Sequence, residues 1–106
     1  MWKLFLDDER YPPTDTLRSN WRIARNVDDA IYYIRIYGRP DYMSLDHDLG
    51  YGKQTGMDFC KWLVNWSIDT GWTIPDFFIH SQNPVGAENM ASYLVSGINF
   101  LIDQQV

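Results

Sequence analysis

Short apolar segments alternate with polar turns along this chain, and four of these segments predict β-strands. They occupy residues 2–6, 21–24, 41–45 and 76–80. The first is apolar except for Lys3, which is typical of a strand covered on both faces in a parallel sheet. The pattern therefore predicts a short buried strand near the start of the chain and others at intervals after it.

Three longer segments have apolar residues every three or four positions and predict helices. The first begins after Asn26, a good helix cap, and ends at Gly38. The second covers about residues 56–70. The third begins at Asn83-Pro84, because proline is tolerated in the first turn. Residues 99–106 either extend this helix or form an edge strand, and the pattern leaves both open.

Strands that alternate with helices predict an α/β fold. We expect a three-layer structure with a mainly parallel sheet, right-handed crossovers and helices on both faces. No internal repeat, low-complexity tract or linker-like charge run divides the sequence. Residues 1–106 are therefore expected to form one domain, with the first strand at its centre.

The overall charge narrows the class of partner. The 106 residues carry a formal net charge of -5. No basic face is available to bind a phosphate backbone, which argues against long nucleic acids as partners. A small phosphorylated ligand is compatible with the sequence, because a divalent cation bound to carboxylates would invert the local charge.

Cysteine use and hydropathy indicate the compartment. Cys60 is the only cysteine, so no disulfide forms within the chain, as suits a reducing environment. The sequence has no signal-peptide pattern and no run of about 20 apolar residues, which a membrane span requires. We therefore expect a cytoplasmic protein with no membrane partner.

Carboxylates follow two of the predicted strands. Asp7 and Asp8 come directly after the first strand, and Asp46 and Asp48 follow the third. Ligands of open α/β sheets bind beyond the carboxyl ends of the strands, so these side chains are expected to share one site. Asp7, Asp8 and Asp46 would bind Mg²⁺ or Mn²⁺ and leave positions open for phosphate oxygens. The alternative is a solvated acidic turn with a surface ion pair.

Both histidines of the chain also stand at predicted strand ends, His47 after the third strand and His80 at the end of the fourth. Imidazole is the usual general acid or base near neutral pH. Beside a metal-bound phosphate, the pair would deprotonate a water and protonate a leaving oxygen. Asp48 would orient a histidine or bind a second metal. Alternatively, either histidine is a buried structural residue.

Four further polar residues are candidate substrate ligands. Ser81 and Asn83 precede the third helix, whose first amides are suited to bind an anion. Arg10 and Lys53 are the cations nearest to the acidic segments in sequence. Asn83 could equally be only a helix cap and Ser81 only a turn residue. Both cations could equally be solvated surface charges.

Three segments resemble, in the same order, motifs of the cyclic-phosphate processing receiver-like domains, which are small relatives of response-regulator receivers. They read LFLDDERYPP, SLDHDLG followed by TGMD, and IHSQNPVGAENM. The resemblance covers nearly the whole chain and implies a flavodoxin-like sheet with strand order 2-1-3-4 and a degenerate fifth strand. It also implies an acidic metal pocket at Asp7, Asp8 and Asp46, and processing of cyclic phosphates or related nucleotides.

The sequence departs from ordinary phosphoacceptor receivers in two ways. Asp46 resembles their acceptor aspartate, and Ser81 resembles the hydroxyl residue after the fourth strand. However, no lysine follows Lys61, so the fifth strand with its lysine is missing. The two histidines add groups that a receiver does not need. Both departures argue against phosphoryl relay.

We therefore expect a metal-dependent phosphoesterase that acts on cyclic phosphates or related small nucleotides, with His80 and His47 as general acid and base. Two alternatives stay open. One is a non-catalytic receiver-like module that sequesters a nucleotide or docks a partner protein. The other is a degenerate phosphoacceptor receiver that would carry a phosphoryl group on Asp46.

Overall fold

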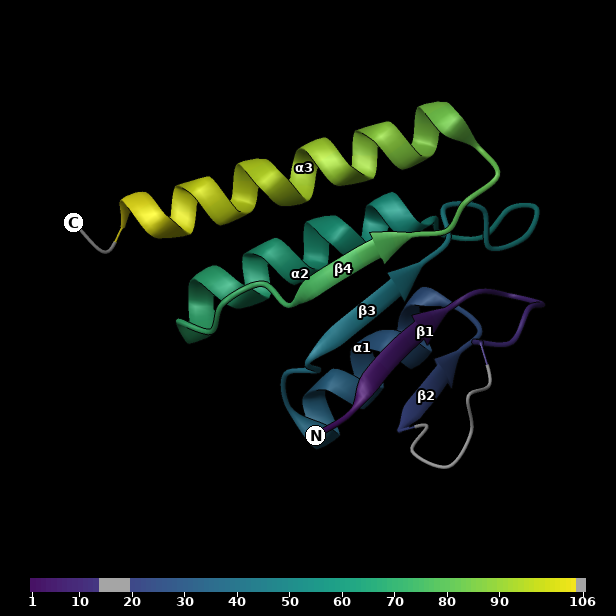
Figure 1. The fold of residues 1–106 in the computed structure, drawn as a ribbon, viewed down its shortest axis with the longest axis horizontal. Helices are drawn as coiled ribbons and strands as arrows, with labels where there is room; N and C mark the ends of the chain where they lie inside the picture. The colour runs from purple at the N-terminus through teal and green to yellow at the C-terminus, as the bar shows by residue number, and fades with distance from the viewer. Residues whose placement is uncertain (14–19, 105–106) are drawn as a thin grey trace.

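The structure, a computed structural model, describes residues 1–13 and 20–104 and contains a four-stranded parallel sheet (Figure 1). Its strands are β1 (Lys3–Leu6), β2 (Trp21–Ala24), β3 (Tyr42–Leu45) and β4 (Asp76–Ile79). Their order across the sheet is β2-β1-β3-β4, with all three pairings parallel. The α/β class and the strand order 2-1-3-4 are therefore confirmed.

A helix follows each of the last three strands. The bounds are α1 (Val27–Tyr37), α2 (Gly56–Thr70) and α3 (Pro84–Asp103). Each helix begins after a side chain that accepts a hydrogen bond from a first-turn amide, and these caps are Asn26, Thr55 and Asn83. α1 and α2 end where Gly38 and Gly71 take φ angles of +83° and +78°, which L side chains rarely adopt.

α3 decides the structure of the C-terminal segment. Residues 99–103 continue the helix and form no edge strand, while residues 105–106 lie outside the described part of the chain. Within residues 1–13 and 20–104 the sheet has no strand beyond β4. The family resemblance implied a degenerate fifth strand, and α3 takes up the chain after β4.

α1 and α2 lie on the same face of the sheet, whereas helices were predicted on both faces. Figure 1 shows α1 and α2 behind the strands, and α3 packs against α2 and β4. The connections β2-α1-β3 and β3-α2-β4 cross the sheet in the same direction, so right-handed crossovers place both helices on the same face. Between β1 and β2, the described residues 7–13 and 20 contain no helix to cover the opposite face.

The hydrophobic core lies between the sheet and this helical layer. Its largest fully buried apolar side chains come from β1, β3 and all three helices: Leu4, Leu6, Ile34, Met43, Leu45, Phe59, Leu63, Met90 and Leu94. Cys60 belongs to the same cluster, and burial raises the pKa of its thiol to about 12. That thiol stays protonated at neutral pH and packs as a small apolar side chain.

The opposite face of the sheet carries aromatic side chains. Side chains alternate along a strand, so Phe5 and Ser44 point away from the helical layer. Phe5 is nevertheless only 3% exposed, because its ring packs against Trp21 and stacks on His80. On this face, the apolar ring of Phe5 therefore supports the side chain of His80, the residue that follows β4.

Candidate functional site

The parallel register brings the ends of three strands together. Leu6 of β1 pairs with Leu45 of β3. The ladder continues for one more residue, because the Asp46 amide donates to the Leu6 carbonyl at 2.9 Å and the His80 amide to the Leu45 carbonyl at 3.0 Å. The residues that leave the three adjacent strands are therefore Asp7, Asp46 and His80.

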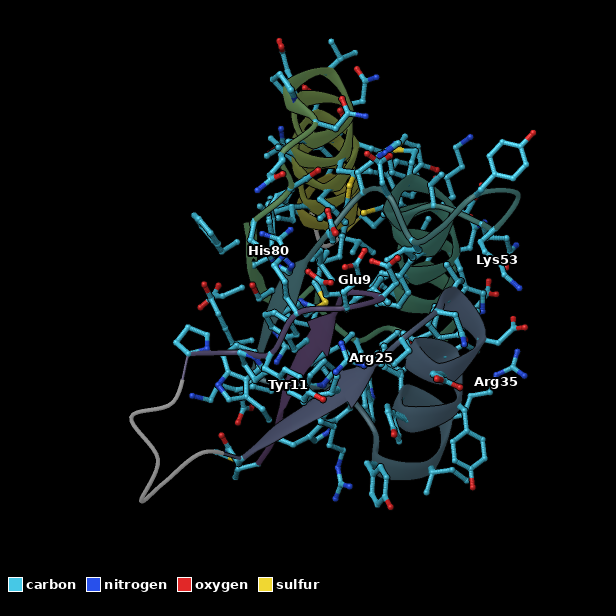
Figure 2. The ribbon with its side chains drawn as sticks, turned by 90° about the vertical axis from the view of Figure 1, so that its right-hand side faces the viewer. Glu9, Tyr11, Arg25, Arg35, Lys53 and His80 are labelled. Atoms are coloured by element: carbon cyan, nitrogen blue, oxygen red, sulfur yellow. The ribbon has the colours of Figure 1, made fainter. Side chains whose placement is uncertain are left out.

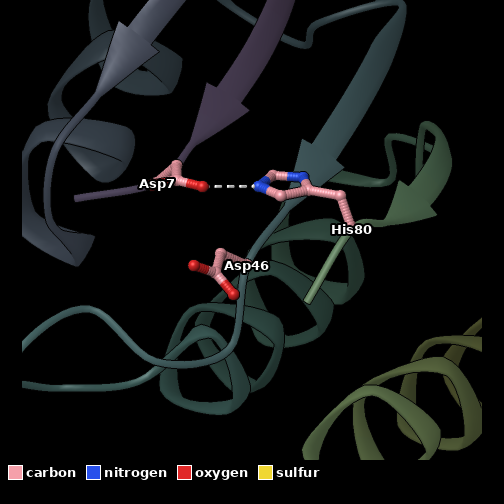
Figure 3. Close-up of side chains that lie close together, drawn as sticks. All are labelled: Asp7, Asp46 and His80. Atoms are coloured by element: carbon pink, nitrogen blue, oxygen red, sulfur yellow. Dashed lines mark hydrogen bonds and ion pairs between the residues drawn. The ribbon is translucent and has the colours of Figure 1, made fainter. Parts of the chain in front are cut away.

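Asp7, Asp46 and His80 form a compact group (Figure 3). A carboxylate oxygen from each aspartate and a ring nitrogen of the histidine all lie within 4.8 Å of one another. Asp7 is 1% exposed and Asp46 is 7% exposed. Buried carboxylates are costly unless they are paired or hydrogen-bonded, so the partners of this group define its chemistry.

Asp7 has a full set of hydrogen-bond partners. Its Oδ1 accepts from the backbone amides of Glu9 and Arg10, each at 2.8 Å. Its Oδ2 is bonded at 2.9 Å to the guanidinium of Arg10 and to His80 Nε2. Burial opposes ionisation of this carboxyl, but the two amides, His80 and the Arg10 charge outweigh it and lower its pKa. Asp7 is therefore an anion at neutral pH.

His80 is held through both ring nitrogens and one ring face. Nε2 bonds Asp7 Oδ2 at 2.9 Å, Nδ1 bonds Ser44 Oγ at 2.7 Å, and the ring stacks on Phe5 with centroids 4.7 Å apart. Because ionised Asp7 only accepts, the tautomer that fits these contacts carries its hydrogen on Nε2 and accepts from the Ser44 hydroxyl at Nδ1. These contacts fix both the tautomer and the plane of the imidazole.

Ser44 is a site residue that the sequence analysis missed. It lies within β3, before the polar residues that follow the strand, and its side chain is buried at 6% exposure. It reaches His80 because alternation puts the two side chains on the same face of neighbouring strands. The available signal was a hydroxyl within an otherwise apolar strand, since a buried hydroxyl needs a partner.

Asp46 is bound less completely than Asp7. Its Oδ1 accepts from the His47 amide at 2.8 Å, and its Oδ2 lies 3.5 Å from Arg10 Nη2. α2 begins in direct contact with this segment, because a Cβ at Gly56 would collide with the Asp46 carbonyl oxygen. Glycine at this position therefore lets α2 start against the end of β3.

Arg10 lies over the carboxylates, and Arg25 holds the loop that carries it. One guanidinium nitrogen of Arg25 donates to the carbonyls of Asp7 and Arg10, at 3.1 and 2.6 Å. The Arg25 guanidinium also lies 4.7 Å from the ring centre of Tyr11, and Figure 2 shows these two residues side by side. The loop after β1 is thus fastened to the end of β2.

His47 and Asp48 form a pair of their own. His47 Nδ1 lies 2.7 Å from Asp48 Oδ1, and this hydrogen bond is the main reason that the pKa of Asp48 is lowered. The His47 ring packs against α3, where a Cβ at Gly86 would lie 2.5 Å from its Cγ. The two predicted catalytic histidines therefore do not meet: His80 joins the carboxylates and His47 lies against the helix.

The other predicted ligands are placed as follows. Ser81 Oγ accepts from the Asn83 amide at 3.0 Å, and Asn83 Oδ1 accepts from the Gly86 amide at 2.9 Å, so both stabilise the start of α3. Lys53 lines a separate hollow beside Arg25. The Cγ of Lys53 lies beside Gly50, close to the Asp8 carboxylate. Of the two predicted cations, Arg10 is the one that forms ion pairs with Asp7 and Asp46.

A pocket of about 620 Å³ opens in front of the carboxylates. It is lined by Asp7, Asp8, Glu9, Arg10, Asp46, Asp48, Gly50, Tyr51 and Gln82. Tyr51 and Gln82 were not predicted; both lie in loops next to the sequence motifs and both are exposed. Five of the lining side chains are carboxylates against one guanidinium, so an anion needs a bound cation to enter.

The donor set suits a hard divalent cation. Asp7 and Asp46 present carboxylate oxygens close together, and such oxygens are the ligands that Mg²⁺ and Mn²⁺ prefer. Arg10 already places a positive charge on both carboxylates, which indicates that this position favours a cation. Asp8 lines the same pocket but does not belong to the compact group; its carboxylate lies near Gly50.

One of three comparisons with known proteins found a match. Residues 2–96 match the family model of the cyclic-phosphate processing receiver domain. The chain belongs to this family. Searches of curated proteins and of solved structures returned no match. In this cyclic-phosphate processing receiver domain, the carboxylates of Asp7 and Asp46 lie together at the ends of β1 and β3.

In this receiver domain, the residue that follows β4 also contacts the carboxylates. His80, directly after β4, hydrogen-bonds to the same Asp7 oxygen as Arg10. The imidazole of His80 and the guanidinium of Arg10 thus both contact Asp7. In the described part of the chain, β4 is the edge strand of the sheet on this side.

Among the described helices, none has the length and apolar composition that a membrane span requires.

Proposed function

We propose that this receiver domain is a metal-dependent phosphoesterase that hydrolyses cyclic phosphates or related small nucleotides. The observation that carries the proposal is the convergence of Asp7, Asp46 and His80 at the edge of a pocket lined by carboxylates. Such a site combines oxygen ligands for a cation with a proton-carrying imidazole, the two components that phosphodiester hydrolysis needs.

Asp7 and Asp46 would hold Mg²⁺ or Mn²⁺, with Asp8 as a further ligand from the pocket wall. When bound, the cation supplies charge neutralisation at the phosphate oxygens and activation of a water. The remaining chemistry falls on side chains of the protein. Hydrolysis adds water across one P–O bond of the cyclic diester, and the departing alkoxide takes up a proton.

His80 is the proposed proton donor. Its Nε2 carries a hydrogen toward Asp7, while the Ser44 hydroxyl holds Nδ1 and the Phe5 ring holds the plane. In this role His80 acts as the imidazolium: a leaving oxygen that approaches the Asp7 carboxylate takes the Nε2 proton, and the ring becomes neutral while Nδ1–H donates to Ser44 Oγ. The proton released by the attacking water then restores the imidazolium. Ser44 and Phe5 act as positioning residues, since they hold the imidazole and would act on the substrate only through it.

Arg10 is the proposed phosphate ligand, because it is the cation that lines the pocket. Asn83 and Ser81 fix the start of α3, and Lys53 does not line the pocket, so we assign these three no direct contact with the phosphate. His47 would act on the pocket only through Asp48, which it binds and which does line the pocket.

The test is turnover of 2',3'- and 3',5'-cyclic nucleotides in the presence of Mg²⁺, Mn²⁺ or a chelator. We expect hydrolysis to require metal and to fall by about a hundredfold or more in His80→Ala, as for loss of a general acid. Asp103→Asn, at the exposed far end of α3, is the matched control and should retain wild-type turnover. Absence of turnover on every cyclic phosphate with metal bound would refute the proposal.

A non-catalytic nucleotide-binding role is the second candidate. The observation in its favour is that both nitrogens of His80 are already hydrogen-bonded, as in a structural histidine. This role predicts that a cyclic nucleotide is recovered unchanged and that His80→Ala keeps most of its affinity. Equilibrium dialysis followed by chromatography of the nucleotide separates it from hydrolysis.

The degenerate phosphoacceptor role makes a different prediction. It requires beryllofluoride or acetyl phosphate to form an adduct on Asp46. Mass spectrometry after acetyl phosphate treatment, with Asp46→Asn as the blank, tests that role directly.

A further inference from the structure

The Arg10 guanidinium occupies the position of a cation between the two metal-ligand candidates. Its Nε lies 2.9 Å from Asp7 Oδ2, and its Nη2 lies 3.5 Å from Asp46 Oδ2. Nη2 also lies 3.4 Å from the His80 carbonyl oxygen. One side chain therefore neutralises the same carboxylates that would hold a divalent cation.

A guanidinium and a divalent cation cannot share these oxygens without strong repulsion. Both are positive, and Asp7 and Asp46 offer two negative charges to them at close range. Asp7 Oδ2 already accepts from Arg10 and from His80, so a metal at this oxygen must displace one of them. His80 is held by Ser44 and Phe5 as well, which makes Arg10 the partner that leaves more easily.

The side chain of Arg10 can move without disturbing the loop. It is 45% exposed, whereas Asp7 beneath it is 1% exposed. The Arg10 backbone is held independently of the guanidinium, because its amide donates to Asp7 Oδ1 and its carbonyl accepts from Arg25. The side chain also lines the pocket in front of the carboxylates, so the guanidinium can move into that open space.

We propose that Arg10 is an exchangeable counter-ion of the site. In the metal-free protein it neutralises Asp7 and Asp46; when a divalent cation binds, it swings into the pocket and contacts a phosphate bound there. This inference rests on the metal site of the proposed function. It adds that metal binding competes with a cation of the protein itself, and that a phosphate ligand favours the exchange.

The experiment is a titration of the full chain with Mn²⁺, followed by electron paramagnetic resonance of free Mn²⁺. The variants are Arg10→Ala, Arg10→Lys and the control Arg35→Ala, which removes the same charge from the exposed side of α1 (Figure 2). We expect Arg10→Ala to bind Mn²⁺ about threefold to tenfold more tightly than wild type, the gain from removing a partly exposed ion pair. Arg10→Lys should fall between, and Arg35→Ala should match wild type.

A second titration adds inorganic phosphate. Phosphate should tighten Mn²⁺ binding to wild type and do so less in Arg10→Ala, because the displaced guanidinium is missing. Circular dichroism and thermal melts establish that each variant is folded.

The outcomes separate the two proposals. Equal or weaker Mn²⁺ binding by Arg10→Ala overturns the exchange and leaves the metal site standing. Failure of both wild type and Arg10→Ala to bind Mn²⁺ overturns the metal site and the exchange together. Tighter binding by Arg10→Ala without hydrolysis of any cyclic nucleotide supports the exchange and overturns only the phosphoesterase.

Discussion

The carboxylate of Asp7 and the imidazole of His80 are joined by a 2.9 Å hydrogen bond although 73 positions separate them in the sequence. The bond exists because β1 and β4 both flank β3 in one parallel sheet, so their ends lie at the same edge. It favours one tautomer of the histidine and helps to lower the pKa of the aspartate. Several properties of the domain follow from this pair and its neighbours.

Removing the Ser44 hydroxyl should loosen the imidazole. In Ser44→Ala, His80 Nδ1 loses its partner at a cost of about 1 kcal/mol. If the hydrolysis proposal holds, turnover should fall by about tenfold, with little change in metal affinity, because Ser44 lies away from the carboxylates. Because Asp7 still accepts from Nε2, nitrogen-15 NMR should show the same His80 tautomer in the variant, and ring relaxation should show greater motion.

Ser67→Ala is the matched control for this substitution. Ser67 is fully buried in α2, and its hydroxyl has no hydrogen-bond partner in the described part of the chain. Its removal should leave turnover unchanged and should not destabilise the fold. Unchanged motion of the His80 ring together with unchanged turnover in Ser44→Ala would contradict the positioning role.

Asp7 should make stability depend on pH in the acid range. Its folded pKa is lower than the ordinary value of 3.8, so the unfolded chain takes up the proton first as the pH falls. The stability contributed by ionised Asp7 is complete above pH 3.8 and is lost as the pH falls through the lowered folded pKa.

Asp7→Asn removes this contribution. We expect it to destabilise the domain by about 1–3 kcal/mol at neutral pH, since Arg10 and His80 lose a charged partner. The difference from wild type should shrink in urea unfolding below pH 3.8. A constant difference across the acid range would show that the carboxylate charge is not its source.

Gly86 and His47 should be coupled. A Cβ at Gly86 would lie 2.5 Å from His47 Cγ, so Gly86→Ala should cost about 1–3 kcal/mol through forced displacement of the ring. In a His47→Ala background the same change should become neutral or stabilising, because alanine is the better helix former. The four proteins form a double-mutant cycle in urea unfolding. An unchanged cost in the His47→Ala background would contradict the packing.

His47 should also control the ionisation of Asp48. The hydrogen bond from His47 is the largest cause of the lowered Asp48 pKa, and the side chain of Asn83 is a smaller one. His47→Ala should therefore raise the pKa of Asp48 toward its ordinary value, and Asn83→Ala should raise it less. Carbon-13 NMR titration of the side-chain carboxyl measures both changes. A larger effect of Asn83→Ala would reverse this assignment.

The local pattern of the sequence was sufficient to predict the helices and strands and part of the candidate site. Periodicity and caps at Asn26 and Asn83 located the helices, because these signals act over a few residues. Asp7, Asp46 and His80 were found as polar residues that follow apolar strands. A parallel sheet brings such ends to one edge whatever the details of packing.

The remaining features needed the packed chain. Ser44 was missed because only register and alternation reveal that it faces His80. His47 was paired with His80, yet the close approach of α3 at Gly86 places its ring against the helix. Helices were expected on both faces, but the direction of the crossovers put α1 and α2 on one. The sequence by itself thus determined which elements form and which carboxylates reach the sheet edge. Only the tertiary structure decided which imidazole meets them, because contacts between distant residues depend on register and helix approach.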